Sequence, residues 1–145
     1  MKKLSFLFIV TLFYSLTTSA QSSSGLPVID YSKTGFDSTA VFEIFNVEKI
    51  PVFPGGEAAM FQFISTNLVY PDSAQVNNVE GVVALSMVIE KDGSLSDIKV
   101  LKDIAYGCGE ASIAMVKKMP KWMPGQIQGT RIRTRYVMPI RFKLK

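Results

Sequence analysis

Residues 81–102 read GVVALSMVIEKDGSLSDIKVLK, and this stretch predicts two antiparallel strands joined by a tight turn. Asp92 and Gly93 mark the turn, because an Asp-Gly pair between two strand patterns is the strongest short hairpin signal. Apolar residues lie on both faces of the first strand, from Val82 to Ile89, so we expect that strand to be central and well covered. The return strand is expected over Leu95–Lys102.

Helical patterns flank this hairpin in the sequence. Apolar residues recur at helical spacing after Gly56, and Tyr70-Pro71 stops the helix, since a residue before proline avoids the helical region. The expected elements are a strand at 40–48, a helix from 56 or 57 to the residues before 70, a short helix at 71–76, strands at 82–89 and 95–102, a helix at 110–119 and a last strand from 131. This order predicts an α+β fold, a small antiparallel β-sheet with two helices packed on one face.

The last strand has the longest alternation in the chain, and its two faces differ in chemistry. One face holds Ile132, Thr134, Tyr136, Met138, Ile140, Phe142 and Leu144, and the other holds Arg131, Arg133, Arg135, Val137, Pro139, Arg141 and Lys143. Pro139 has no amide hydrogen to donate, so the strand belongs at a sheet edge or carries a bulge. Two interpretations of this basic edge stay open. Its charges prevent aggregation, or it accepts a partner segment as an added strand.

The composition argues against catalysis. The 145-residue chain has no histidine and one cysteine, Cys108, which excludes a Ser-His or Cys-His pair and an internal disulfide. Cys108 is expected to be an inert thiol; Asp92 is expected to serve the hairpin turn, and Asp97 and Asp103 to be solvated. Trp122 lies between two prolines and is interpreted as a core residue, with a contact role as the alternative. We therefore predict a chain that is not an enzyme and uses no cofactor or metal.

The first 20 residues have the pattern of an export signal. Two lysines, Lys2 and Lys3, precede an apolar run from Leu4 to Leu16, and small residues precede Gln21. The run is shorter than the roughly 20 residues that span a bilayer as a helix, so we expect a cleaved signal, with a retained anchor as the alternative. Cleavage lowers the 16 basic residues to 14, against 12 acidic ones, and nucleic-acid binding is not expected.

Six segments, in order along the chain, are similar to one known family. They are PVFPGGE at 51–57, NLVYP at 67–71, EGVV at 80–83, EKDGS at 90–94, MPKWMPG at 119–125 and MPIRF at 138–142. Together they resemble the TonB C-terminal domain, over roughly Ile50 to Leu144. The resemblance divides the chain into a signal peptide at 1–20, an N-terminal extension with one short strand at 21–49, and a TonB C-terminal-like domain at 50–145.

The resemblance implies a non-enzymatic binding module in the periplasm that acts in TonB-dependent transmembrane transport. Members of the family bind the TonB box, a short segment at the N-terminus of outer-membrane transporters, as an extra strand beside their last strand. This mode agrees with the interpretation of the C-terminal strand as an edge that accepts a partner. The partner-binding residues implied here are Arg131, Arg133, Thr134, Arg135, Tyr136, Val137 and Met138.

This sequence departs from the family at its N-terminus. An energy-transducing TonB has a retained membrane helix, which contacts the ExbB–ExbD motor, and a long proline-rich linker. Here about thirty residues separate the predicted cleavage site from Pro51, and they span at most roughly 100 Å. Contact with ExbB–ExbD is expected only if the N-terminus stays anchored in the inner membrane. The alternative function is a structural or adaptor protein of the envelope that binds cell wall or forms a homodimer, without energy transduction.

Overall fold

The central strand of the fold is β2 (Gly81–Ile89), which lies between two antiparallel neighbours in a computed structural model that describes residues 37–144. The predicted signal peptide lies outside the described residues. β2 pairs with β6 (Arg133–Phe142) on one side and β3 (Leu95–Lys102) on the other. The expectation of a central, covered strand is confirmed, because Leu85 on one face and Val88 on the other are both buried.

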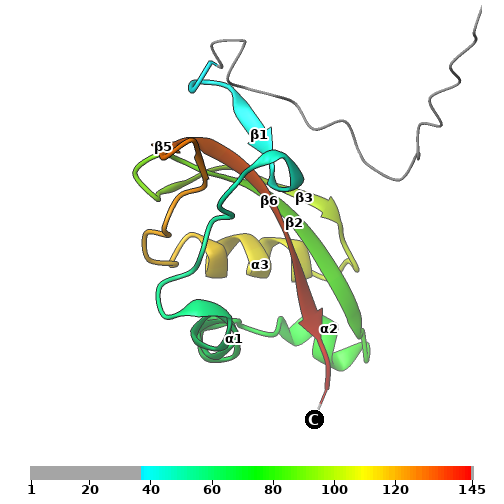
Figure 1. The fold of residues 1–145 in the computed structure, drawn as a ribbon. Helices are drawn as coiled ribbons and strands as arrows, with labels where there is room; N and C mark the ends of the chain where they lie inside the picture. Colours follow the sequence, from blue (N-terminus) through cyan, green and yellow to red (C-terminus); the bar gives the residue numbers. More distant parts are fainter. Residues whose placement is uncertain (1–36, 145) are drawn as a thin grey trace, which may run out of the picture. The chain divides into compact units, whose positions relative to one another are not determined.

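The sheet has four strands in the order β1-β6-β2-β3, and it is mixed (Figure 1). β1 (Val41–Glu43) runs parallel to β6 and pairs with it over three residues only, whereas β2 pairs antiparallel with β6 from Gly81 to Ile89 without a register shift. The expected sheet was antiparallel throughout, so β1 is a difference from that prediction. A separate two-stranded hairpin, β4 (Gln126–Ile127) and β5 (Thr130–Arg131), precedes β6.

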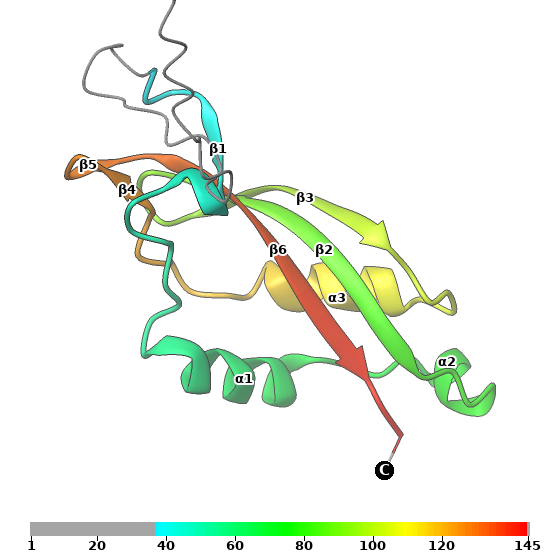
Figure 2. The same cartoon turned by 45° about the vertical axis from the view of Figure 1, so that its right-hand side comes forward.

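Helices α1 (Gly56–Asn67) and α3 (Cys108–Val116) lie on the same face of the sheet (Figures 1 and 2). The predicted α+β fold is confirmed. Each helix follows a glycine with a left-handed backbone, Gly55 at φ 83° and Gly107 at φ 82°, a conformation that glycine adopts without steric cost. The predicted short helix is present as α2 (Asp72–Val76), but it begins one residue later than expected, because the backbone of Pro71 is extended, with ψ at 137°.

Two strands and one helix have other boundaries than the sequence predicted; the helix is α3, which covers Cys108–Val116 instead of 110–119. The expected strand at 40–48 ends at Glu43 and continues as a 3₁₀ turn, η1 (Ile44–Asn46), because the chain then leaves β6. From Glu48 its amides donate to Gln126 instead, at 3.1 Å. The expected last strand is interrupted at Ile132, whose amide donates to the carbonyl of Gly125 at 3.0 Å. The residues before this break form the β4–β5 hairpin.

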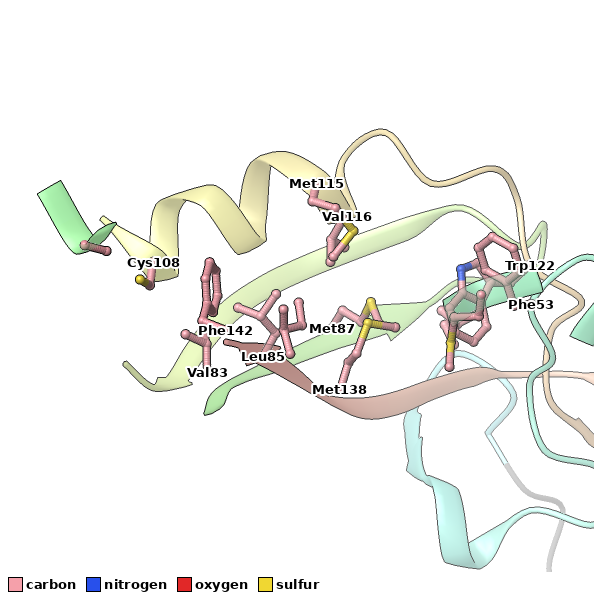
Figure 3. Close-up of a cluster of buried hydrophobic side chains, with 14 residues drawn as sticks. Phe53, Val83, Leu85, Met87, Cys108, Met115, Val116, Trp122, Met138 and Phe142 are labelled. Atoms are coloured by element: carbon pink, nitrogen blue, oxygen red, sulfur yellow. The ribbon is translucent and has the colours of Figure 1, made fainter. Parts of the chain in front are cut away.

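The core fills the space between the sheet and the helices (Figure 3). Trp122 is 4% exposed, and its ring meets Phe53 edge-on, with centroids 5.5 Å apart, at one end of this cluster. At the other end Phe142 packs edge-on against Tyr70, with centroids 5.3 Å apart. The interpretation of Trp122 as a core residue is confirmed. Its contact with Tyr136, at 5.2 Å, connects this core to the C-terminal strand.

Candidate functional site

The two sides of β6 are paired to different extents. On one side β2 pairs with β6 along its length, but on the other side β1 pairs only with the stretch from Arg133 to Arg135. From Tyr136 to Phe142, no strand among residues 37–144 pairs with this second side. We call Tyr136–Phe142 the open edge. An unpaired strand edge presents main-chain donors and acceptors that can pair with another strand.

The register shows which main-chain groups point outward. The amide of Glu90 donates to Ser94 at 2.8 Å, so the main chain of Glu90 faces β3 and that of its neighbour Ile89 faces β6. Ile89 is opposite Thr134, and alternate residues of β6 from Thr134 therefore face β2. The residues between them face outward, and on the open edge these are Val137, Pro139 and Arg141. Pro139 agrees with this assignment, because proline has no amide hydrogen to offer to β2.

The side chains of the open edge divide between the two faces of the sheet. Met138, Ile140 and Phe142 point toward the helices and are buried, each 1% exposed. Val137 and Arg141 point to the opposite face and are exposed. A strand added to this edge therefore has a helix-covered face on one side and an open, partly basic face on the other.

Arg133 is held by a carboxylate at the end of β2. Its Nε and Nη2 donate to the two carboxylate oxygens of Glu90, at 2.8 and 2.9 Å, in a bidentate pair. The hydrogen bond from Arg133 keeps the pKa of Glu90 below its ordinary value, and the same bond raises the pKa of Arg133. Arg133 also donates to the carbonyl of Thr39 at 3.1 Å, which fastens the chain before β1 to the sheet.

Arg135 is likewise paired within the chain. Its Nε lies 3.4 Å from a carboxylate oxygen of Glu43 in β1, and its Nη1 lies 3.4 Å from Asp97 in β3. These two arginines thus connect β1 to the rest of the sheet. By contrast, no acid among the described residues forms an ion pair with Arg131 or Arg141.

The seven residues implied by the family resemblance are therefore separated in the structure. Arg131 lies in β5, before the break at Ile132, and is exposed. Arg133, Thr134 and Arg135 lie beside β1, and Thr134 is fully buried. Tyr136, Val137 and Met138 begin the open edge. Arg141 also lies on the open edge; the sequence analysis placed it on the basic face of this strand but did not include it among the implied binding residues.

An open pocket lies at the start of the open edge, on the helix side. Its volume is about 270 Å³. Its walls come from η1, the loop that leads to α1, α1 itself, the loop after α3 and β6, and they include Ile44, Ile50, Pro51, Met60, Trp122 and Tyr136. We call this the Tyr136 pocket. It is mostly apolar, with the carboxylate of Glu57 as the charged group in its wall.

The other candidate residues do not assemble into a reactive site. Asp92 accepts hydrogen bonds from the amide of Ser94 at 3.0 Å and from Lys121 at 2.9 Å, which confirms its predicted turn role. Asp97 is exposed, as expected, and it also forms ion pairs with Lys99 and Arg135. Over residues 37–144, no group of three or more cysteine, aspartate or glutamate side chains is placed to hold a metal ion.

Cys108 begins α3 and is fully buried. Burial, together with the nearby carboxylates of Asp103 and Glu110, raises the pKa of its thiol, which keeps it protonated at neutral pH. Both its inaccessibility and its protonation agree with the expectation of an inert thiol. Among residues 37–144, none of the helices has the length and hydrophobicity of a membrane span.

Comparisons with known proteins identify the family. The profile described as Gram-negative bacterial TonB protein C-terminal matches residues 66–144. Two NMR solution structures of the Helicobacter pylori TonB C-terminal domain are similar to the chain. One shares 32% sequence identity over 59% of this chain and 78% of its own, with a TM-score of 0.43. The other shares 31% identity over 62% and 97%, with a TM-score of 0.41. A comparison with curated proteins gave no significant match.

The fold and the site together define a small α+β domain with a partly open sheet edge. The chain belongs to the TonB C-terminal family, as the six sequence segments predicted. This is a non-enzymatic family of the Gram-negative periplasm that takes part in TonB-dependent transport. The matched region begins within α1, so the proline-rich turn at 51–57 precedes it.

Proposed function

We propose that this chain binds the TonB box of an outer-membrane transporter by adding it as a strand to the open edge of β6. The observation that carries the proposal is the end of β1 at Glu43, opposite Arg135. Beyond this point the outward main-chain groups of β6 have no neighbouring strand among the described residues. Main-chain hydrogen bonds supply affinity in this binding mode, and alternate side chains supply selectivity.

The open edge lies further toward the C-terminus than the residues that the resemblance implied, and the two overlap only from Tyr136 to Met138. Binding over Arg133–Arg135 requires the removal of β1, with the ion pair between Arg135 and Glu43 and the hydrogen bond from Arg133 to Thr39. Binding over Tyr136–Phe142 requires no such change. We therefore expect the incoming segment to offer main-chain donors and acceptors to Val137, Pro139 and Arg141.

The test is a titration of the isotopically labelled chain with TonB-box peptides, followed by the NMR shifts of backbone amides. We expect the amides of Val137 and Arg141 to shift most, because a new hydrogen bond forms on each. The amides of Leu101 and Lys102 in β3 serve as the control, since β3 lies at the opposite edge of the sheet. Unchanged amides at Val137 and Arg141 at millimolar peptide would contradict the proposal.

Self-association through the same edge is the second candidate function. The exposed side chain of Val137 and the unpaired groups of the open edge favour it, since both are available to another copy of the chain. Sedimentation velocity separates the two functions. A stable dimer that peptide does not dissociate supports self-association, whereas a monomer whose edge amides respond to peptide supports transporter binding.

A further inference from the structure

The two ends of the open edge border different side-chain environments. At its start the Tyr136 pocket opens on the helix-covered face, and Ile50 in the pocket wall is 56% exposed. At its end Arg141 is exposed on the opposite face, with no ion-pair partner among the described residues. An apolar pocket and an unpaired cation are two different recognition elements, and both border the same row of main-chain groups.

The geometry of a sheet connects these two elements. Residues directly opposite each other on paired strands point their side chains to the same face. In an added strand, the residue opposite Tyr136 therefore points toward the pocket, and the residue opposite Arg141 points to the basic face. Tyr136 and Arg141 are five positions apart in an unshifted strand. An odd separation places two side chains on opposite faces, as the two elements require.

The charges favour one arrangement of the added strand. Glu57 lines the pocket, and it lies close enough to Tyr136 to contribute, after burial, to the raised pKa of that phenol. A carboxylate at the pocket therefore meets a like charge. A carboxylate at the other end meets Arg141, with Lys143 nearby in the sequence and also exposed. The pocket is suited to an apolar side chain and the end of the edge to an acidic one.

From this, we infer that the partner segment carries a large apolar side chain and, five residues away, a carboxylate. The apolar side chain enters the Tyr136 pocket, and the carboxylate pairs with Arg141. This inference rests on the proposed function, and it adds the side-chain pattern by which the edge selects its partner. The direction of the added strand is left to the test, because the five-residue spacing holds for either direction.

The test uses the full chain and a set of capped peptides. Each peptide has a background of alternating valine and threonine, with one leucine and one aspartate at spacings from three to seven residues, in both orders. We expect the tightest binding at a spacing of five, about tenfold tighter than a peptide with neither residue, because burial of a leucine side chain supplies an effect of that size. Spacings of four and six place both side chains on one face, so only one of the two contacts can form, and these peptides are expected to bind more weakly than the peptide with a spacing of five.

Variants of the chain assign each half of the pattern. Ile50→Ser is expected to remove the gain from leucine, and Arg141→Gln the gain from aspartate. Val69→Ser and Lys102→Gln are the matched controls, since both residues are exposed and lie outside the open edge, its pocket and the binding residues that the resemblance implies. The charge-reversed variant Arg141→Glu is expected to prefer a peptide with lysine in place of aspartate.

The readouts separate this inference from the proposed function. If the Val137 and Arg141 amides shift equally for every spacing, strand addition stands and the side-chain pattern is wrong. If those amides shift neither with any of these peptides nor with TonB-box peptides, both the proposed function and the side-chain pattern are wrong. A maximum at a spacing of five that survives in Ile50→Ser and Arg141→Gln also overturns the inference, because the two residues then do not read the segment.

Discussion

At the scale of single residues, Gly93 shows how the central hairpin is joined to the core. Its backbone is left-handed, with φ at 86°, and its carbonyl accepts a hydrogen bond from the amide of Trp122 at 2.8 Å. A Cβ atom at this position would lie 2.0 Å from the carbonyl oxygen of Trp122. The glycine is therefore required twice, by the turn and by the close approach of the tryptophan loop.

We expect Gly93→Ala to lower the free energy of unfolding by about 3 kcal/mol, since it adds a main-chain clash to the cost of a left-handed alanine. Gly129→Ala is the control. Gly129 has φ at 73°, but nothing lies within 4 Å of an added Cβ, so only the backbone cost of about 1 kcal/mol applies. Urea unfolding measures both. Equal losses of unfolding free energy in the two variants would show that the close contact between Gly93 and Trp122 adds nothing to the cost of the alanine.

The buried thiol of Cys108 gives a second prediction at this scale. Because Cys108 is fully buried and its pKa is raised, labelling by an aromatic disulfide reagent is expected only when the domain opens. The labelling rate should therefore rise with the urea concentration, in step with the unfolding that tryptophan fluorescence reports. Immediate labelling of the native chain would contradict this account and restore Cys108 as a candidate for chemistry.

At the scale of elements, β1 is a short strand that arginine side chains of β6 fasten to the sheet. Three residues give it few main-chain bonds, and the fastening comes from Arg133 and Arg135, which connect Thr39 and Glu43 to the sheet. The sequence interpretation of the arginines as edge protection and their implied role in binding are both incomplete. In the structure, both arginines are also paired within the chain, Arg133 with Glu90 and Arg135 with Glu43 and Asp97.

This arrangement predicts a pH dependence of β1. The pKa of Glu90 is lowered below its ordinary value of 4.5, chiefly by the hydrogen bond from Arg133. The stabilisation from this pair is therefore complete above the ordinary pKa and is lost as the pH falls through the folded pKa. We expect hydrogen exchange of the Val41–Glu43 amides to report increased opening below about pH 4, after correction for the intrinsic rate.

Glu90→Gln is expected to produce the same increase, several-fold, at neutral pH, because the bidentate ion pair is removed without a change of shape. Asp92→Asn is the matched control in the same hairpin turn, since Asp92 contacts Ser94 and Lys121 and not β1. A β1 whose amides exchange at the same rate in all three chains would mean that main-chain pairing alone holds it.

Elements whose signals are local were predicted well from the sequence. The boundaries of β3 agree with the prediction, and β2 and α1 agree to within a few residues, because the Asp-Gly turn and Tyr70-Pro71 act within the segment they bound. β1 was predicted too long, because its end depends on Gln126, far away in the sequence. The β4–β5 hairpin was missed, because its turn at Gln128 and Gly129 lacks the usual Asn-Gly or Asp-Gly pair.

Only part of the candidate site has a signal in the sequence. The alternation of β6 and the edge signal of Pro139 are visible in the sequence, and both hold in the structure. The length covered by β1 is not visible, because parallel pairing of Val41 with Arg133 has no local signal. For the same reason, the Tyr136 pocket could not be predicted, since its walls combine segments that are distant in the sequence.

At the scale of the whole molecule, Pro139 limits how completely the open edge can pair. It faces outward without an amide hydrogen, so one donor is missing in the middle of the edge. We expect Pro139→Val to leave the free energy of unfolding nearly unchanged, because the ladder to β2 does not use this amide. Self-association should rise, because the edge becomes continuous. Sedimentation velocity measures the change.

Val137→Ile is the control for this prediction, since it enlarges the exposed apolar surface of the same edge without adding a donor. If both variants associate equally, apolar surface and not main-chain pairing causes the association. If Pro139→Val stays monomeric at high concentration, the missing donor is not what keeps the edge free.

The straight course of the open edge, along which β6 keeps one register with β2, has a mechanical consequence for the proposed complex. Hydrogen bonds in a sheet run across the strands. A tether that lies beside β6 and is pulled along the strand axis loads all its bonds in shear at the same time. The same tether peeled away from one end breaks them one after another and detaches under a smaller load. A short segment paired with this edge is therefore expected to resist a force along the strand axis and to dissociate easily when a force peels it from one end.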